Sequence, residues 1–409
     1  MELFLLIGIV VVFFGSGMLL VKYLTVPPVR MSLYLLLTVI FLIGGVLLIM
    51  NAGAVGIQNW ISILLGASFF FGGYCTQTRL FLNRDDPRAI PELTRTPEDP
   101  GDGHTAVVYF THGEPEVYDP IGWINQFNEF EEQKIAFVPF IAKPWFVFNL
   151  RNHYLIVGKS NHRGEHFNML SSIEQRFRDR GDDSTKFYIS FLDDDPRPDA
   201  AVIQALNDGA SKIVVAEVFL TISNHTAEGK HLIEELDVLE NFNIPIVYTG
   251  PMWDSARLKE MFVDRVNRNL GDQPKDKVGI LLVGHGQPDE WDVEWSTETE
   301  QEISFREDVL NNLAADGFLP ENMSLAWMEF KEPKPKDKVE EFYAKGLKVV
   351  FYFSAAISAD ALHAQYDVPA LMAKANVPEE FQMVNLGAWN NDPIVIDAIM
   401  EKIDSVFKD

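Results

Sequence analysis

A short motif occurs twice in this chain of 409 residues. In each copy an apolar run ends at His-Gly-x-Pro, and an aromatic residue followed by aspartate comes three residues after the proline. The two histidines are His112 and His285. An unbroken apolar run is typical of a buried parallel strand, and a side chain at the carboxyl end of such a strand lies where open α/β sheets bind ligands. The repeat therefore predicts two similar lobes, each with one histidine at a shared cleft.

The similarity between the two halves continues beyond this motif. Another apolar run precedes a Pro-x-Pro sequence in both halves, and the second proline of each, Pro198 or Pro335, lies 11 residues before a glycine. This spacing predicts a helix that is capped by Gly209 or Gly346 and is followed by a β-branched strand. The repeated order of strand, helix and strand predicts an α/β fold with two Rossmann-like lobes, each built on a parallel sheet. The two lobes are expected at residues 105–270 and 271–409.

The first half contains a segment that the second half lacks. His112 and Pro196 are 84 residues apart, whereas His285 and Pro333 are 48 apart. The additional residues include aromatic side chains interleaved with arginine, lysine and histidine. In an otherwise acidic protein this composition would suit the rim of a site for a flat, anionic and apolar ligand. The alternative is an ordinary surface excursion of the chain.

The first 80 residues differ in composition from the rest of the chain. Three apolar stretches follow one another there, and each is close to the roughly 20 residues that a helix needs to cross a bilayer. We therefore expect an N-terminal transmembrane region of three helices, at about residues 3–24, 31–51 and 57–75. The first stretch lacks a basic start and a cleavage site of small residues, which favours a retained helix over a signal peptide.

Basic residues predict an orientation for these helices. Lys22 and Arg30 flank the first connection, Arg79 follows the third stretch, and the second connection has no basic residue. The positive-inside rule therefore predicts a multi-pass protein of the cell inner membrane, with the chain after residue 76 in the cytoplasm. Cys75 is the one cysteine in the sequence, which excludes an internal disulfide and fits that compartment. Residues 81–104, rich in proline and aspartate, are expected to form a polar linker.

The net charge of −25 restricts the class of partner. A strongly acidic surface repels nucleic acid and anionic lipid headgroups and attracts cations. We therefore expect no nucleic-acid partner. The alternative origin of the charge is adaptation to a salty habitat, and the composition does not decide between the two.

Several motifs together resemble those of the class II tetrapyrrole chelatases, and in layout they are most similar to ferrochelatase. The similar elements are a glycine-proline turn with a Tyr-Asp pair, a Tyr-x-x-Ile-Gly-Gly-x-Ser element, a serine-threonine element, a Ser-Ala-His-x-Leu-Pro element and an Asp/His-rich segment near the C-terminus. The resemblance covers residues 105 to 405. Its motifs are Gly113–Asp119, Tyr154–Ser160, Ile222–Gly229, Val283–Pro288 and Ile357–Asp367.

Two histidines depart from the ferrochelatase pattern. Ferrochelatases have a glutamate opposite the motif histidine, whereas His363 stands in that place here when the segment is aligned on Tyr366. His112 resembles a feature of the smaller chelatases, which insert cobalt or iron into sirohydrochlorin with a pair of histidines. The Tyr154–Ser160 element, which the small enzymes lack, points back to ferrochelatase.

The resemblance implies a membrane-anchored lyase that inserts Fe(II) into a porphyrin, as in haem biosynthesis. Its partners would be a porphyrin or related tetrapyrrole, the membrane, and a divalent ion that serves as substrate. The ion would be Fe(II), or else Co(II) or Zn(II), and no tightly bound cofactor is expected. Two alternatives remain open: a sirohydrochlorin cobalt or iron chelatase of the cobalamin or sirohaem pathway, and a non-catalytic carrier of tetrapyrrole or metal.

The candidate catalytic residues are histidines. Neutral imidazole binds borderline ions such as Fe(II), Co(II) and Zn(II), and near neutral pH it also accepts a proton. We expect His285 and His363 to bind the metal and to act in catalysis together with His112. The alternatives are a capping or core histidine for His285, a histidine on a helix face for His363, and a turn former for His112.

Other side chains are candidates for supporting roles. Glu294, Glu298 and Glu302 recur every four residues and so share one helix face, where they could carry metal or protons; a solvated face is the simpler interpretation. Arg151 and Tyr154 could contact propionates, with a loop salt bridge as the alternative for the arginine. The remaining candidates are Ser160, Ser223 and Thr226 for substrate binding, and Asp360, Asp367 and His225 as partners of the catalytic histidines.

Overall fold

The computed structural model describes residues 3–51, 57–132 and 138–407, and in it the chain divides into two units. The first unit comprises Met1–Pro87 together with Val117–Lys159. The second comprises Arg88–Glu116 together with Ser160–Asp409 and contains both sheets. The segment that distinguishes the first half of the sequence therefore belongs largely to the unit of the N-terminal helices.

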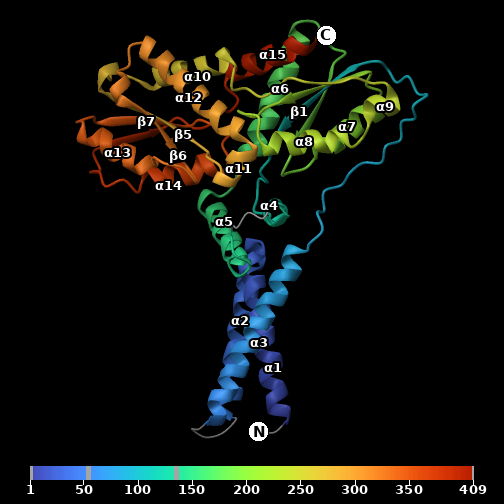
Figure 1. Ribbon diagram of the computed structural model, residues 1–409, viewed down its shortest axis with the longest axis vertical. Coiled ribbons are helices and arrows are strands. Elements are labelled where there is room, and N and C mark those ends of the chain that lie inside the picture. The colour runs from blue at the N-terminus through green and yellow to red at the C-terminus, as the bar shows by residue number, and fades with distance from the viewer. Residues whose placement is uncertain (1–2, 52–56, 133–137, 408–409) are drawn as a thin grey trace. The chain divides into compact units, whose positions relative to one another are not determined.

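The first unit is helical (Figure 1). Two of its helices, α1 and α2, are long and apolar enough to cross a membrane, by length and composition alone. The third, α3, is a helix of 26 residues, but among the described residues it does not reach this apolar character. The prediction of three apolar spans is thus corrected to two, because α3 has polar residues at both ends, Gln58 and Asn59 at its start and Gln77 to Arg79 near its close. The helices of this unit are α1 (Leu3–Thr25), α2 (Pro28–Asn51), α3 (Ile57–Leu82), α4 (Ile121–Glu132) and α5 (Lys143–Val157).

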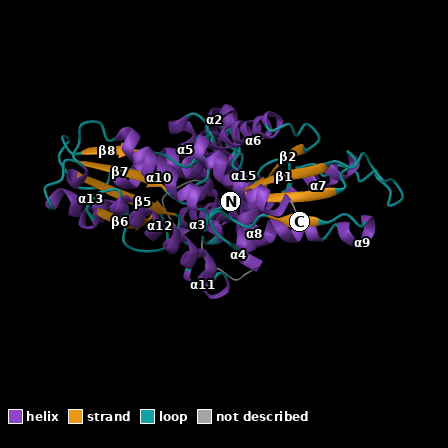
Figure 2. Cartoon of the chain, turned by 90° about the horizontal axis from the view of Figure 1, so that it is seen from above, coloured by secondary structure: helices purple, strands orange, loops and turns teal. Residues whose placement is uncertain are grey.

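The second unit contains two four-stranded sheets in which every strand pair is parallel. The strand orders are β2-β1-β3-β4 and β6-β5-β7-β8, so the sheets have the same topology. Figure 2 labels the strands of the second sheet in the order β6, β5, β7 and β8. The prediction of two similar α/β lobes is confirmed. The strands are β1 (Thr105–Thr111), β2 (Lys186–Phe191), β3 (Lys212–Glu217), β4 (Ile246–Tyr248), β5 (Val278–Gly284), β6 (Met323–Trp327), β7 (Val349–Ser354) and β8 (Gln382–Asn385).

The helices that follow the Pro-x-Pro sequences form where the sequence predicts them. Gly209 and Gly346 follow these helices in the left-handed region of the backbone, with φ of +91° and +83°. That conformation ends a helix and favours glycine. The helices of this unit are α6 (His162–Asp179), α7 (Pro198–Asn207), α8 (Asn224–Glu234), α9 (Val238–Phe242), α10 (Ala256–Asn269), α11 (Asp289–Glu294), α12 (Ser296–Ala315), α13 (Pro335–Ala344), α14 (Val368–Met372) and α15 (Pro393–Phe407).

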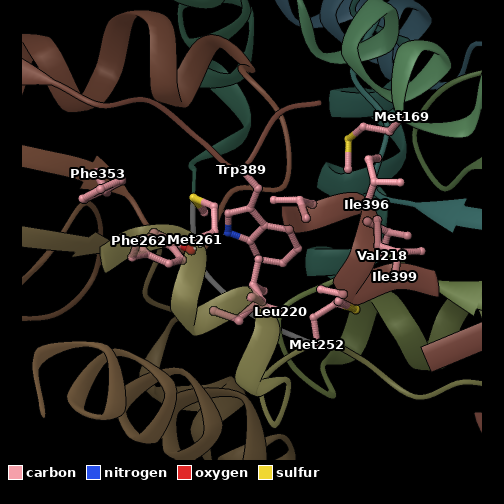
Figure 3. Close-up of a cluster of buried hydrophobic side chains, with 14 of the residues drawn as sticks. Met169, Val218, Leu220, Met252, Met261, Phe262, Phe353, Trp389, Ile396 and Ile399 are labelled. Carbon is pink, nitrogen blue, oxygen red and sulfur yellow. Dashed lines mark hydrogen bonds between the residues drawn. The ribbon is translucent and has the colours of Figure 1, made fainter. Parts of the chain in front are cut away.

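A continuous hydrophobic core joins the two lobes of the second unit. Trp389 is fully buried at its centre, and its indole N–H donates to the carbonyl of Ala355 at 2.9 Å. Side chains of both lobes surround it, including Val218 and Phe353 (Figure 3). The C-terminal helix α15 contributes Ile396 and packs against α10 and β3. This shared core fixes the two sheets relative to each other within the unit.

Candidate functional site

Four histidines follow the two central strand pairs of the sheets. In the first sheet, β2 and β3 lie on opposite sides of β1, so the strand order reverses between β1 and β3, which flank a topological switch point. In the second sheet, β5 and β7 flank the equivalent switch point. Loops at the carboxyl ends of such strands diverge and form the ligand sites of open parallel sheets. His112 follows β1, His225 lies in the first turn of α8 after β3, His285 follows β5, and His363 comes after β7.

His285 and His363 form one pair of imidazoles. Their ring centroids are 5.3 Å apart and their planes are 74° from each other. Nδ1 of His285 lies 2.6 Å from the carbonyl oxygen of Gly286, and because a carbonyl only accepts, Nδ1 carries the proton. Burial, together with the neighbouring His363, lowers the pKa of His285 below its ordinary value. His285 is therefore neutral, with the lone pair of Nε2 left for a metal ion or a proton.

His363 has the opposite protonation state. Its Nδ1 lies 2.7 Å from Oδ2 of Asp367, which a π-helical turn places four residues further on. Burial opposes the cationic form, but the hydrogen bond and charge of Asp367, with Glu329 and Glu114, outweigh it and raise the pKa of His363 to about 9. The pair thus combines a neutral imidazole with a protonated one, and the carboxylate behind His363 is an arrangement that orients metal-binding histidines.

Partly buried carboxylates lie close to this pair. Glu114, the variable residue of the first His-Gly-x-Pro motif, accepts a hydrogen bond from the backbone N–H of Leu362 at 2.9 Å, and burial raises its pKa. The charge of Glu329 acts on the pKa of both His285 and His363. The surroundings of the imidazoles are therefore acidic, which favours cations and disfavours a ligand with many carboxylates.

Helix α12 contacts the loop that carries His285 and holds it in place. Oε1 of Glu302 accepts the backbone N–H of His285 at 3.0 Å, and Glu302 is almost fully buried beside the buried Arg306. Gly284 is required here, because a Cβ at this position would overlap the carboxylate of Glu302. One turn earlier, burial and the charge of Glu302 raise the pKa of Glu298 to about 8. Glu298 and Glu302 share one face of α12, and that face is largely buried rather than solvated, but Glu294 does not belong to it, because it ends the separate helix α11 and is exposed.

His112 and His225 form a second pair in the first lobe. Their ring centroids are 4.7 Å apart with planes at 76°. Nδ1 of His112 donates to the carbonyl of Gly113 at 3.0 Å, and its Nε2 lies 3.4 Å from Oδ2 of Asp193. Burial, with His112 and His285 nearby, lowers the pKa of His225 well below its ordinary value. His225, a minor candidate from the sequence, is thus placed beside His112.

Two further histidines, His162 and His166, lie on α6 and were not singled out from the sequence. Their Nε2 atoms are 3.2 Å apart, and burial lowers the pKa of both. Nδ1 of His166 is hydrogen-bonded to the hydroxyl of Tyr109 at 2.8 Å. Nε2 of His166 also lies 3.3 Å from Oγ1 of Thr111, the residue before His112, and 3.2 Å from Oγ of Ser358, so this pair lies near the other imidazoles. Their spacing of four residues was the available sequence signal.

The predicted substrate residues Arg151 and Tyr154 lie on α5, in the unit of the N-terminal helices. Arg151 is fully buried, and its Nη1 donates to the carbonyls of Tyr23 and Val26 at 2.6 and 2.9 Å, at the end of α1. Tyr154 is also buried, with its ring 6.1 Å from that of Tyr118. The structure gives the arginine a role in holding α5 to α1.

The other predicted substrate residues make local hydrogen bonds. Ser160 accepts the backbone N–H of His162 at 3.2 Å. Ser223 and Thr226 form the capping box at the start of α8, which fixes the turn that carries His225. Asp360 accepts the backbone N–H of Ala388 at 3.0 Å and so supports the loop before His363. These residues position the histidine loops.

Among the residues that the structure describes, no group of three or more histidine, cysteine, aspartate or glutamate side chains is arranged to hold a metal ion. Each imidazole pair would therefore supply two protein ligands and leave the other coordination positions open. Open positions are needed for an ion that passes to another ligand, whereas structural sites are closed by four protein ligands.

No family model matches this sequence, and no curated protein matches it. Its fold is similar to those of several solved chelatase structures. SirB from Bacillus subtilis with Fe3+ is 16% identical with a TM-score of 0.47, over 74% of this chain and 95% of that chain. The multi-domain protein DR2241 from Deinococcus radiodurans, described as structurally similar to chelatases, is 13% identical with a TM-score of 0.47. The match covers 73% of this chain and 54% of DR2241. CbiX, a terminal enzyme of siroheme biosynthesis in denitrifying bacteria, is 14% identical with a TM-score of 0.41, over 74% and 99%.

The chain resembles the class II tetrapyrrole chelatases in its motifs, and the structures similar to it include two sirohydrochlorin chelatases and a chelatase-like protein. Similarity at these identities and TM-scores does not define a substrate for this chain.

Proposed function

We propose that this protein inserts a divalent metal ion into a tetrapyrrole. The observation that carries the proposal is the imidazole pair at the β5/β7 switch point, with centroids 5.3 Å apart and Asp367 behind His363. Two imidazoles with open coordination positions suit borderline ions such as Fe(II), Co(II) and Zn(II). The ion is a substrate in this reaction, so the incomplete protein ligand set is an advantage.

The pair also accounts for the protons of the reaction. An ion that binds Nε2 of His363 must first displace the proton that the raised pKa of about 9 keeps there. When the ion passes to the ring, two imidazole Nε2 atoms are vacated and the ring has two pyrrole protons to lose. His363 takes one proton back, and His285 takes the other and passes it to the neighbouring carboxylates, of which Glu329 acts on both histidines.

We propose Fe(II) and a porphyrin of low charge as the first candidate substrates, as in a ferrochelatase. The acidic surroundings of the imidazoles disfavour a ring with many carboxylates, and the apolar helices α1 and α2 fit a protein that takes an apolar ring from the membrane. On this proposal α1 and α2 anchor the protein in the cell inner membrane, with the sheets on the cytoplasmic side.

The second candidate is a sirohydrochlorin chelatase for cobalt or iron. The specific observation in its favour is His363, which stands where ferrochelatases have a glutamate and pairs with His285. Because imidazole is a better ligand for Co(II) than the carboxylate of a glutamate, this pair would suit Co(II) as well as Fe(II).

An anaerobic assay with each ring and each metal tests the proposal. The full-length protein in detergent is mixed with protoporphyrin or sirohydrochlorin and with Fe(II), Co(II) or Zn(II), and the Soret band is followed over many equivalents. Repeated turnover with one combination supports a chelatase and identifies its substrates. A spectral shift that stops at one equivalent indicates a carrier and contradicts the proposal.

Variants connect the activity to the pair. His285→Ala and His363→Ala are each expected to lower kcat by at least about 100-fold, because each removes a metal ligand and a proton acceptor. His231→Ala is the matched control, since the side chain of His231 is 71% exposed and pairs with Glu235 at the C-terminal end of α8. Its activity should equal that of the unchanged protein.

A further inference from the structure

We propose that Phe330 is a specificity-determining residue of the proposed chelatase. Its ring packs against the macrocycle of the substrate and favours an apolar porphyrin over a ring with many carboxylates. The inference rests on the proposed function and deepens it, because it assigns a contact to the macrocycle, whereas the histidines bind the ion.

Phe330 has a backbone conformation that phenylalanine rarely adopts. Its φ is +52°. In the described part of the chain, the other non-glycine residues with positive φ are aspartate or asparagine, which tolerate this region: Asp237, Asn243 and Asn390. A strained residue of this kind persists only where its surroundings hold it, and such residues cluster at ligand sites. Glycine would adopt the same conformation without strain, so the strain points to a role for the phenylalanine ring.

The internal repeat shows that Phe330 belongs to a longer turn than its counterpart. In both lobes a backbone hydrogen bond closes the turn between the strand and the first proline of Pro-x-Pro, at 2.8 Å (Phe191 to Pro196) and 2.9 Å (Trp327 to Pro333). Four residues, 192–195, lie between these points in the first lobe, and five residues, 328–332, lie between them in the second. The second lobe therefore has one additional residue in this turn.

The neighbours of Phe330 hold the turn against the loop that carries His285. The N–H of Glu329 donates to the carbonyl of His285 at 3.0 Å. The N–H of Lys331 donates to the carbonyl of Glu329, which places Phe330 at the centre of a tight three-residue turn. The same carbonyl packs against Gly286, where an added Cβ would lie only 2.5 Å from it. Phe330 is therefore fixed next to a residue that contacts His285.

An exposed apolar surface adjoins this turn. Lys331 forms an ion pair with Asp292 of α11, a helix that begins four residues after His285. The side chain of Phe330 is 41% exposed, and that of Val293 on α11 is 88% exposed. An aromatic ring held rigidly beside a site is suited to stack on a flat, apolar ligand. A macrocycle centred on the imidazole pair would cover this surface.

The same surface discriminates between rings by their charge. A ring with carboxylates around its edge would place some of them against Phe330 and Val293, which offer no hydrogen bond, and near the acidic Glu329. Loss of hydration without a new partner makes such contacts unfavourable. An apolar edge meets neither cost.

Ring binding without metal tests the inference. The full-length protein in detergent is titrated with protoporphyrin and, separately, with sirohydrochlorin, and the fluorescence of the ring is followed. Phe330→Ala should weaken protoporphyrin binding about tenfold, the scale of one lost aromatic contact with its buried area, and change sirohydrochlorin binding by less than about twofold. Tyr343→Ala is the control, because Tyr343 on α13 is also 41% exposed, and it should bind both rings as the unchanged protein does.

A glycine variant separates the ring of Phe330 from its backbone. Phe330→Gly should bind protoporphyrin as weakly as Phe330→Ala and yet have a higher melting temperature than Phe330→Ala, because glycine relieves the strain. Phe330→Leu serves if the alanine variant fails to fold, and it should also weaken protoporphyrin binding selectively.

Unchanged protoporphyrin affinity in these variants would overturn the inference, and so would an equal loss for both rings. Failure of the proposed function is distinguishable, because it appears as an absence of turnover with every ring and metal in the unchanged protein. Normal turnover by the unchanged protein and by Phe330→Ala, with equal KM for protoporphyrin, would overturn the role of Phe330 alone.

Discussion

At the residue scale, the proposed metal transfer depends on the protonation state that its neighbours give each histidine. His285 is kept neutral by burial, whereas Asp367 keeps a proton on His363. The sequence identified His285 and His363 through repeat and resemblance, but not their protonation. That property depends on which side chains surround a buried imidazole, and Glu114 and Glu329 are 249 and 34 positions from His363 in the chain.

Asp367→Asn tests the carboxylate behind His363. In the unchanged protein, Co(II) must displace the proton on His363, so affinity should rise about tenfold per pH unit up to about pH 9 and then level off. The amide removes the main cause that raises this pKa, so the levelling should move at least one unit lower. Metal affinity measured between pH 6 and 10 checks this. Asp360→Asn keeps the oxygen that accepts the N–H of Ala388 and should leave the profile unchanged.

Glu298→Gln tests a buried carboxyl by stability. Burial and Glu302 raise the pKa of Glu298 in the folded protein to about 8, above the unfolded value of 4.5. The folded protein therefore loses stability as the pH rises from about 4.5 to about 8, since the carboxyl of Glu298 ionises more easily in the unfolded chain. The neutral amide removes this loss, so the variant should be more stable by up to about 4 kcal/mol at pH 8.5 and nearly unchanged at pH 4.5. Urea unfolding measures this, and a constant difference across pH would contradict it. Glu300→Gln, exposed on the same helix, is the control.

At the scale of elements, the sequence predicted the repeated strands, the two helices after Pro-x-Pro, and the histidines at strand ends. These features follow from local patterns that both lobes share. The burial of Glu302 and the pairing of His162 with His166 were not predicted, because a four-residue spacing shows a common helix face without showing what covers it. The third apolar stretch was over-interpreted because it begins with Gln58 and Asn59, and the same helix continues through Gln77 and Arg79 to Leu82.

Gly286→Ala tests the turn that carries His285. Gly286 has φ +83°, and a Cβ there would collide with the backbone carbonyl of Glu329. Gly346 also has φ +83°, but a Cβ at that position meets no atom within 4 Å. In both alanine variants the left-handed backbone lowers the free energy of unfolding by about 1 kcal/mol. Gly286→Ala should lose about 2 kcal/mol more and most of the metal binding, as measured by urea unfolding and Co(II) titration. Equal losses in the two variants would contradict the collision.

At the scale of the whole molecule, the N-terminal helices do more than the sequence predicted for a tether. Segment Val117–Lys159 groups with them in one unit, and Arg151 and Tyr118 bond to carbonyls at the end of α1. The sequence predicted neither contact, because the segment interrupts the first lobe and its partners lie about 90 to 130 residues earlier. The ends of the segment adjoin, since Ser160 N–H donates to the carbonyl of Glu116 at 3.0 Å.

Two truncations test this grouping. Removal of residues 1–80 alone should expose the buried face of α5 and leave the Arg151 guanidinium without its carbonyl partners, so the product should aggregate. Removal of the same residues together with replacement of 117–159 by a short glycine-serine linker should give a folded protein. Size-exclusion chromatography and thermal unfolding compare the two. A monodisperse, equally stable product from the first truncation would contradict the grouping.

On the proposed function, the imidazoles of His285 and His363 transfer a metal ion to a tetrapyrrole. The most direct measurement is the rate of metal insertion by the unchanged protein and by His285→Ala, each shown to be folded by its thermal unfolding. We expect multiple turnover by the unchanged protein and a rate of metal insertion at least about 100-fold lower in His285→Ala. A variant within about threefold of the unchanged protein would contradict it.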